Sequence, residues 1–240
     1  MNNKNVIIIG ASSGIGKELA KVFSEKGFTV GLTARRVELL SQIAKELPGA
    51  SFVKHMDISN TDEAIKAIEQ LIKEMGGVQT IVINAGIGFV NPDLDWEKEK
   101  STIDVNVTGF AAMANVAMKQ FIKQGFGHLI GISSISAIRG SSHAPAYSAS
   151  KAFMSHYLEA MRLKVLKMKI PVTITDIQPG FVDTAMAQGE KFWVASARTA
   201  ALQIFDAIEK KKSHAYVTKR WRLIAWILKL TPTRYLAKYY

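Results

Sequence analysis

The chain has 240 residues, of which 48% are hydrophobic and 21% charged, and it contains no cysteine. This length and composition predict one large globular domain with a single core, and the lack of cysteine excludes disulfides and cysteine-ligated metals. Of the 31 basic residues, 22 lie in residues 1–209 with all 20 acidic residues, and nine lie in residues 210–240. Because the net positive charge is concentrated in residues 210–240, we do not expect residues 1–209 to bind nucleic acid.

The sequence gives no sign of export or of a membrane span. The first apolar run, residues 6–9, is shorter than the ~7–15 residues of a signal-peptide core. No stretch reaches the ~18 uncharged apolar residues that a spanning helix needs. We therefore expect a cytoplasmic protein, and peripheral attachment to a membrane through the basic tail stays open.

Short β-branched runs alternate with stretches of helical periodicity. In chain order we expect strand 6–9, helix 14–26, strand 29–33, helix 37–47, strand 52–56, helix 64–75, strand 78–84, helix 103–122, strand 128–133, helix 147–168 and strand 172–177. Strands that are apolar on both faces and separated by helices indicate a parallel sheet covered on both sides. We predict a doubly wound, Rossmann-type domain over residues 1–218 with a basic helical extension over 219–240, and a ligand site at the carboxyl ends of the strands.

A glycine-rich turn, Gly10-Ala-Ser-Ser-Gly14-Ile-Gly16, joins the first strand to the first helix. Glycines there let the main chain approach a pyrophosphate, and the free N–H groups of the helix N-terminus meet its charge. A glycine-rich turn without a ligand is the alternative. The position between strand and helix favours a dinucleotide site.

The end of the second strand reads Ala34-Arg35-Arg36. An acidic residue at this place would bind the ribose 2′-hydroxyl of NAD, whereas an arginine accommodates the 2′-phosphate of NADP. The pair therefore favours NADP(H) over NAD(H), with Arg35 as the preferred contact. Solvated charges at the start of a helix are the alternative.

Ser134, Tyr147 and Lys151 form the third group. Tyr147 and Lys151 are four residues apart, so they share one helix face. A nearby ammonium stabilises tyrosinate and lowers the pKa of a tyrosine, which could then give a proton to a carbonyl oxygen as a hydride arrives. A non-catalytic NADP-binding regulatory or membrane-associated scaffold protein is the alternative, but such a protein is expected to have lost one of these three residues.

Six motifs together carry a resemblance: GASSGIG (10–16), NAG (84–86), DVNVTG (104–109), ISS (132–134), YSASK (147–151) and PGFVDT (179–184). Over residues 5–218 the chain resembles the short-chain dehydrogenase/reductase family. The resemblance implies that Ser134 polarises the substrate oxygen and that Tyr147 is the acid in reduction. It also implies that Lys151 tunes Tyr147 and holds the nicotinamide ribose, and that Asn106 keeps a water beside Lys151. A hydrogen bond from the helix interior to a neighbouring strand is the alternative role for Asn106.

The same resemblance implies the residues that hold the cofactor. They are Gly10, Ser12, Ser13, Gly14, Ile15, Gly16, Arg35, Arg36, Asp57, Ile58, Asn84, Ala85, Gly86, Tyr147, Lys151, Pro179, Gly180, Val182 and Thr184. Two positions depart from the family pattern, with Ile9 in place of threonine and Ile83 in place of asparagine. Both positions brace the turns, so we expect little effect.

The substrate side is expected in the segment after Thr184, which includes Phe192 and Trp193, with His143 as a further candidate beside Ser134 and Tyr147. Phe89 and Val90 are expected to face the same space. Apolar lining suits an apolar carbonyl compound or alcohol. Two alternatives stay open: Phe192 and Trp193 could only pack the segment onto the body, and His143 could be solvated. No histidine shows metal-ligand spacing, so we expect no metal site.

The tail carries a predicted helix over residues 219–230 with basic and apolar residues. Three arrangements stay open: packing on a partner subunit or on its own cleft, a membrane surface with Trp221 and Trp226 at headgroup level, or a mobile tail. The family resemblance also implies a homodimer or homotetramer through helices 103–122 and 147–168. Those helices bury apolar faces inside the domain too, so the sequence does not establish the oligomer.

Overall fold

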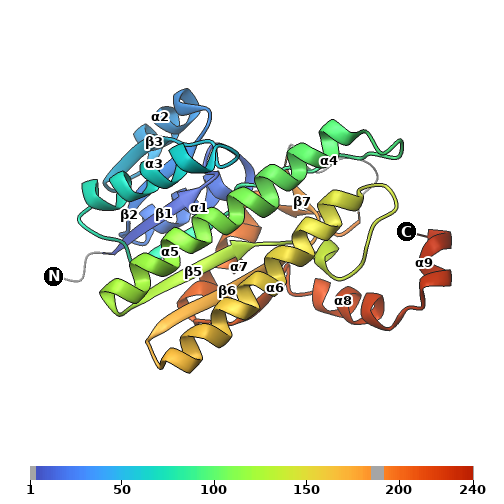
Figure 1. Cartoon of the computed structure of the whole chain (residues 1–240). Helices are drawn as coiled ribbons and strands as arrows, with labels where there is room; N and C mark the ends of the chain where they lie inside the picture. Colours follow the sequence, from blue (N-terminus) through green and yellow to red (C-terminus); the bar gives the residue numbers. More distant parts are fainter. Residues whose placement is uncertain (1–3, 185–191, 240) are drawn as a thin grey trace.

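A computed structural model describes residues 4–184 and 192–239. Its centre is a seven-stranded sheet, every pair of neighbours parallel, in the order β3-β2-β1-β4-β5-β6-β9 (Figure 1). The strands are β1 (Asn5–Ile9), β2 (Thr29–Ala34), β3 (Ser51–His55), β4 (Thr80–Ile83), β5 (Gly127–Ile132), β6 (Val172–Pro179) and β9 (His214–Val217). This confirms the predicted doubly wound parallel sheet.

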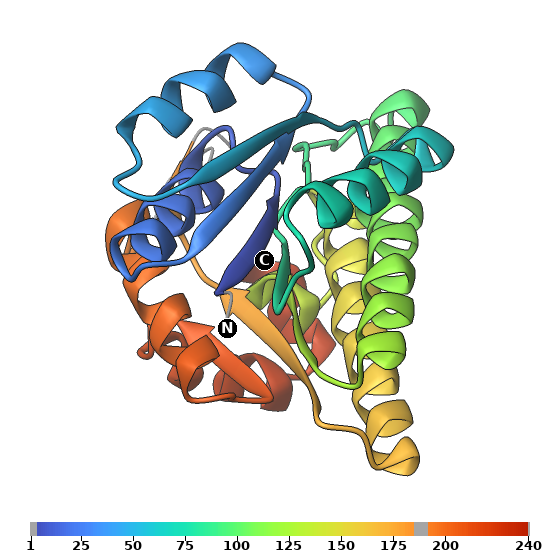
Figure 2. The ribbon, with the colours of Figure 1, turned by 90° about the vertical axis from the view of Figure 1, so that its left-hand side faces the viewer.

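Helices cover both faces of the sheet, as Figure 2 shows. One face carries α1 (Gly14–Glu25), α2 (Val37–Glu46) and α7 (Ala197–Glu209). The other carries α3 (Thr61–Glu74), α5 (Phe110–Gln124) and α6 (Pro145–Met168). Strand β1 shows why two cores form. Val6 and Ile8 enter the core with α1, while Ile7 and Ile9 enter the core with α3 and α5, because successive side chains of a strand point to opposite faces.

The helix expected at 103–122 is longer and interrupted. It comprises α4 (Trp96–Ile103), a π-helical turn at Asp104–Gly109, and α5. The run that begins at Trp96 is strongly charged, so its apolar periodicity is weak and the prediction began too late. π-Turns within α-helices are frequent at functional sites, and this one carries Asn106.

Three features beyond β6 were not predicted. They are α7, the edge strand β9, and a small parallel sheet of β7 (Val182–Asp183) and β8 (Ala195–Ser196). The two strands of the small sheet have two residues each, which is too short to produce a periodic pattern. They lie on either side of residues 185–191, which are outside the described residues.

The tail continues as α8 (Trp221–Leu230) and α9 (Thr233–Tyr239), at the lower right of Figure 1, and α8 packs on the body. Trp221 and Ala225 are buried against a cluster that includes Ile135 and Phe181. Trp221 therefore does not lie at a headgroup level, contrary to one of the three expected arrangements, whereas Trp226 is exposed. Among the helices of the described residues, none is both long and apolar enough to cross a bilayer.

Candidate active site

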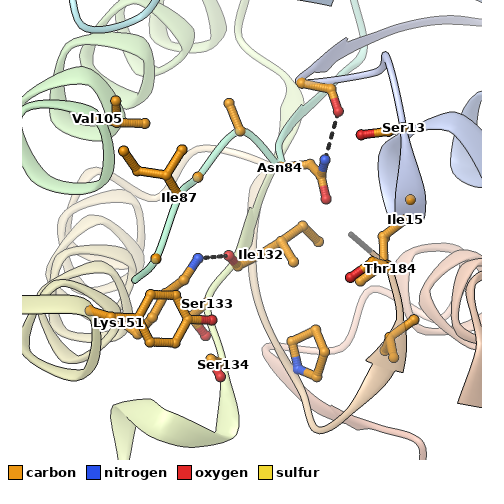
Figure 3. Close-up of a pocket in the computed structure, with 18 of the residues that line it drawn as sticks. Ser13, Ile15, Asn84, Ile87, Val105, Ile132, Ser133, Ser134, Lys151 and Thr184 are labelled. Carbon is orange, nitrogen blue, oxygen red and sulfur yellow. Dashed lines mark hydrogen bonds between the residues drawn. The ribbon is translucent and has the colours of Figure 1, made fainter. Parts of the chain in front are cut away.

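A cavity of about 410 Å³ opens at the carboxyl ends of the strands. It lies where the chain order of the sheet reverses, between β1 and β4, which is the usual ligand site of this architecture. Most of the predicted cofactor and catalytic residues line it: Gly10, Ser12, Ser13, Gly14, Ile15, Arg35, Arg36, Asp57, Ile58, Asn84, Ala85, Gly86, Ser134, Tyr147, Lys151, Pro179, Gly180, Val182 and Thr184. In Figure 3, Ser13, Ile15 and Thr184 face Lys151, Ser133 and Ser134 across the opening.

The glycine-rich turn is packed so tightly that its glycines have no room for side chains. Gly10 has a φ of +89°, and a Cβ there would lie 2.6 Å from the main-chain nitrogen of Ala85. Asn84 Nδ2 donates to the Gly10 carbonyl at 2.7 Å and ties the turn to the end of β4 (Figure 3). A Cβ on Gly16 would lie 2.1 Å from the same carbonyl oxygen. Gly16 is absent from the cavity wall and serves this packing.

The N-terminus of α1 points its first turn at the cavity. Ser13 stands at the N-cap position with extended backbone and makes no side-chain capping bond. The first N–H groups of the helix are therefore available to an anion. Together with the glycine-rich turn, this arrangement fits the pyrophosphate of a dinucleotide.

The two arginines of the predicted NADP contact both line the cavity, but their side chains have different partners. Arg35 Nη1 lies 4.0 Å from Asp57 Oδ2, and its side chain is largely exposed. Arg36 Nη2 donates to the hydroxyls of Ser12 and Ser13, at 3.0 and 3.3 Å. The Arg35 guanidinium group is therefore mostly exposed, while the Arg36 side chain is held against the glycine-rich turn.

Lys151 is fully buried at the floor of the cavity. Its ammonium donates to the Ile132 carbonyl at 3.0 Å (Figure 3) and lies 5.7 Å from the centre of the Tyr147 ring. Burial lowers the pKa of Lys151 to about 8, against the opposing pull of the Asp176 carboxylate. Lys151 is thus a cation that can lose its proton near neutral pH, next to the predicted acid.

The two serines at the end of β5 have different partners. Ser134 begins a short helical turn, and its hydroxyl accepts from the Ser136 N–H at 3.1 Å on the cavity wall. The Ser133 hydroxyl donates its one hydrogen to the buried carboxylate of Asp176 and also lies 3.0 Å from the Ile177 carbonyl oxygen. Asp176 was not predicted, although an acidic residue inside an apolar strand was the available signal.

Asn106 lies behind the cavity wall. Its side chain accepts from the Ile87 N–H and donates to the Ile87 carbonyl and the Ser150 hydroxyl, at 2.9, 2.7 and 3.0 Å. These hydrogen bonds have a structural role, but the partners of Asn106 lie on the loop after β4 and on α6, and not on a neighbouring strand as the alternative expected. A Cβ on Gly86 would lie 3.2 Å from Asn106 Oδ1 and 3.3 Å from the Lys151 ammonium, so the three residues meet. A water held between them stays a prediction.

Gly88 is a site residue that sequence reasoning missed. A Cβ there would lie 2.4 Å from a ring carbon of Tyr147. Gly88 therefore creates the space in which the phenol ring stands. The second glycine of the AGIG run was the only signal available in the sequence.

Three predicted substrate residues do not line the cavity, as far as the described residues define its wall: His143, Phe192 and Trp193. His143 is exposed, and its carbonyl accepts from the Asn91 N–H, so the wall carries Ala144 instead. Instead, Phe192 packs against Trp221 at a tilt and Trp193 packs edge-on against it.

The wall on this side is apolar and is formed by the expected Phe89 and Val90 together with Ile135 and Phe181. Phe181 packs edge-on against both Phe192 and Trp221. The expected segment at 185–191 lies outside the described residues.

A family model described as short chain dehydrogenase matches residues 4–194. An uncharacterized oxidoreductase of Myxococcus xanthus is 34% identical over 197 residues, which cover 80% of this chain and 77% of that protein. A mouse dehydrogenase/reductase, SDR family member 7B, is 28% identical over 241 residues, which cover 91% and 74%. The sequence relatives thus extend over most of the chain.

Solved structures agree in fold at lower identity. An alcohol dehydrogenase from Thermococcus sibiricus, complexed with 5-hydroxy-NADP, superposes with a TM-score of 0.80 at 22% identity, covering 89% of this chain and 95% of that one. A 3-ketoacyl-(acyl-carrier-protein) reductase from Brucella melitensis, complexed with NADH, gives 0.81 at 22% identity, covering 90% and 97%. The chain belongs to the short-chain dehydrogenase/reductase family and is an oxidoreductase.

Proposed function

We propose that this oxidoreductase reduces an apolar carbonyl compound, or oxidises the corresponding alcohol, with NADP(H) as cofactor. The observation that carries the proposal is the shared cavity: Ser134, Tyr147 and Lys151 line the same space as the glycine-rich turn. Chemistry on a carbonyl needs a proton donor within reach of the substrate oxygen, and this arrangement supplies one beside a dinucleotide cradle.

The residues that would hold the cofactor come from the ends of several strands. The glycine-rich turn and the N-terminus of α1 suit its pyrophosphate, Asp57 and Ile58 its adenine, and the 179–184 segment its nicotinamide end. When bound, the nicotinamide group donates or accepts the hydride. Lys151 is within the same wall and would hold the ribose next to that group.

Proton transfer is assigned to Tyr147. The Lys151 ammonium lies near its ring and favours the charged form of the phenol. Tyr147 would give its proton to the substrate oxygen in reduction and take it back in oxidation. Ser134, whose hydroxyl already accepts from the Ser136 N–H, would donate its own hydrogen to the same substrate oxygen and orient it.

The preference for NADP(H) rests on the two arginines at the end of β2. No carboxylate stands at residue 34, where an acid would select a free ribose hydroxyl. Arg35 offers an exposed guanidinium fork suited to a phosphate. Arg36 is anchored on the Ser12 hydroxyl and adds positive charge to the same rim.

An apolar substrate is supported by the apolar side chains that line the same cavity as Ser134. Phe89, Val90, Ile135 and Phe181 line this part of the cavity. An apolar wall with few polar groups selects substrates by burying their hydrocarbon surface. A polar sugar-like substrate would leave its hydroxyls without partners there.

A screen of aldehydes, ketones and acyl carbonyls tests the proposal. Purified protein is mixed with NADPH that carries deuterium at its transferable position, and products are analysed by mass spectrometry. The proposal expects deuterium on the former carbonyl carbon of at least one apolar compound. Tight NADPH binding without label transfer to any carbonyl class would favour the non-catalytic regulator instead.

A further inference from the structure

Helix α8 is fixed on the body by two sets of contacts, so its two sides are well defined. Trp221 is 2% exposed, packs edge-on against Phe181 and belongs to the buried cluster under the helix. At the other end, the Arg139 side chain donates to the carbonyls of Leu228 and Thr231, at 2.8 and 2.7 Å. A cation that binds the last carbonyls of a helix stabilises its end.

The outward side of α8 is apolar as well. Leu223, Trp226, Ile227 and Leu230 are 59%, 66%, 49% and 64% exposed. At ~100° per residue these four side chains occupy one arc, opposite Trp221. Surface helices normally turn polar residues to water, and a helix that is apolar on nearly all sides is normally covered. A cover for this face is therefore expected.

The charges beside this face indicate what covers it. Arg222 and Lys229 are exposed along one flank of the apolar arc. Residues 210–240 contain nine basic residues and no acidic one. A second copy pressed face to face on α8 would bring like charges together, whereas an anionic lipid surface attracts them. Tryptophan at such a face is typical of the water–lipid interface.

We propose that α8 docks the enzyme on an anionic phospholipid surface. Leu223, Trp226, Ile227 and Leu230 would enter the interface, with Arg222 and Lys229 beside the lipid phosphates. Because Trp221 on the opposite side packs on Phe181 of the cavity wall, docking would hold the cavity close to the bilayer. The proposal goes beyond the hydride-transfer assignment and does not depend on it.

Co-sedimentation of the full chain with vesicles tests the proposal. The protein should bind vesicles that mix phosphatidylglycerol with phosphatidylcholine and should not bind phosphatidylcholine alone. Added salt should release it, because ions screen the attraction. Arg222→Gln/Lys229→Gln should weaken partitioning about thirtyfold. Leu223→Ser/Leu230→Ser should weaken it about tenfold or more, through lost apolar contact.

Helix α6 offers a matched control. Leu163 and Leu166 are 56% and 66% exposed and also have lysines as chain neighbours, so Leu163→Ser/Leu166→Ser removes equal apolar surface elsewhere. The proposal requires this control to bind like the parent, and all variants to keep the parent's unfolding temperature. Equal loss in both leucine pairs would overturn it. A second result would also overturn it: the parent does not bind vesicles, and light scattering shows that the parent is a dimer and the Leu223→Ser/Leu230→Ser variant a monomer.

Discussion

The end of the cavity proposed to hold the cofactor and the end proposed to hold the substrate are built in different ways. The cofactor end is formed by short turns that directly follow β1, β2 and β4, with contacts between the main chain and small residues such as Gly10 and Asn84. The substrate end is formed by Phe181, which rests on Trp221 of α8, and by the loop tied down through Arg139. Its parts come from segments up to 92 residues apart.

This difference explains why the lining residues of one end could be predicted from the sequence and those of the other end, apart from Phe89 and Val90, could not. A glycine turn between a strand and a helix carries its function within a few consecutive residues. The substrate end depends on which aromatic rings meet after folding. Phe192 and Trp193 were expected on the wall, but they pack against Trp221 instead. Substitutions at the cofactor end should therefore change cofactor affinity, and substitutions at the substrate end should change the KM for the substrate.

The largest effect outside the catalytic groups is expected at Gly88, where the two ends meet. Gly88→Ala would push on the Tyr147 ring and should lower kcat about a hundredfold, because small misplacements of a reacting group are costly. Steady-state kinetics measure it. Gly140→Ala is the control, since a Cβ there meets nothing within 4 Å. Equal kcat in both variants would show that the ring position does not matter.

The pH dependence of reduction should follow Lys151. Its pKa of about 8 means that the ammonium is present below that pH and lost above it. We expect kcat/KM for reduction to fall about tenfold per pH unit as the pH rises beyond about 8. A buffer series measures the profile, and Arg35→Ala should show the same profile. A rate that stays flat well above this pH would contradict a role for the charged lysine.

Cofactor choice should depend on Arg35. Arg35→Ala should weaken NADPH binding about tenfold and leave NADH binding nearly unchanged, because only the 2′-phosphate loses a charged partner. Fluorescence titration gives both dissociation constants. Arg234→Ala, an exposed arginine on α9, controls for the loss of one charge. Equal affinity of the parent for the two cofactors would refute the preference.

The smallest effect is expected at the substrate end. Arg139→Ala removes the bonds that hold the end of α8 and should lower the free energy of unfolding by ~1–2 kcal/mol. It should also raise the KM for the carbonyl several-fold while NADPH affinity stays constant. Arg162→Ala is matched, because Arg162 also binds main-chain carbonyls, those of Ile174 and Ser213, away from the cavity. If both variants raise the KM equally, α8 does not shape the substrate site.

The alternation of strands and helices could be predicted because each element carries its own apolar pattern. The interruption around Asn106 could not be predicted, because local periodicity carries no signal for it. At its end, Gly109 packs so closely on a distant segment that a Cβ would lie 2.5 Å from the Ile58 carbonyl oxygen. Asp176 and Arg139 were missed for a related reason. A buried acid and an arginine that caps a distant helix acquire their partners only through tertiary packing.

The central claim is that Tyr147 donates the proton, and one pair of variants tests it most directly. Tyr147→Phe should lower turnover by about a thousandfold or more with NADPH affinity unchanged. Tyr157→Phe, on the same helix and packed against Phe110, should retain the parent rate. A Tyr147→Phe enzyme that turns over at close to the parent rate would contradict the account.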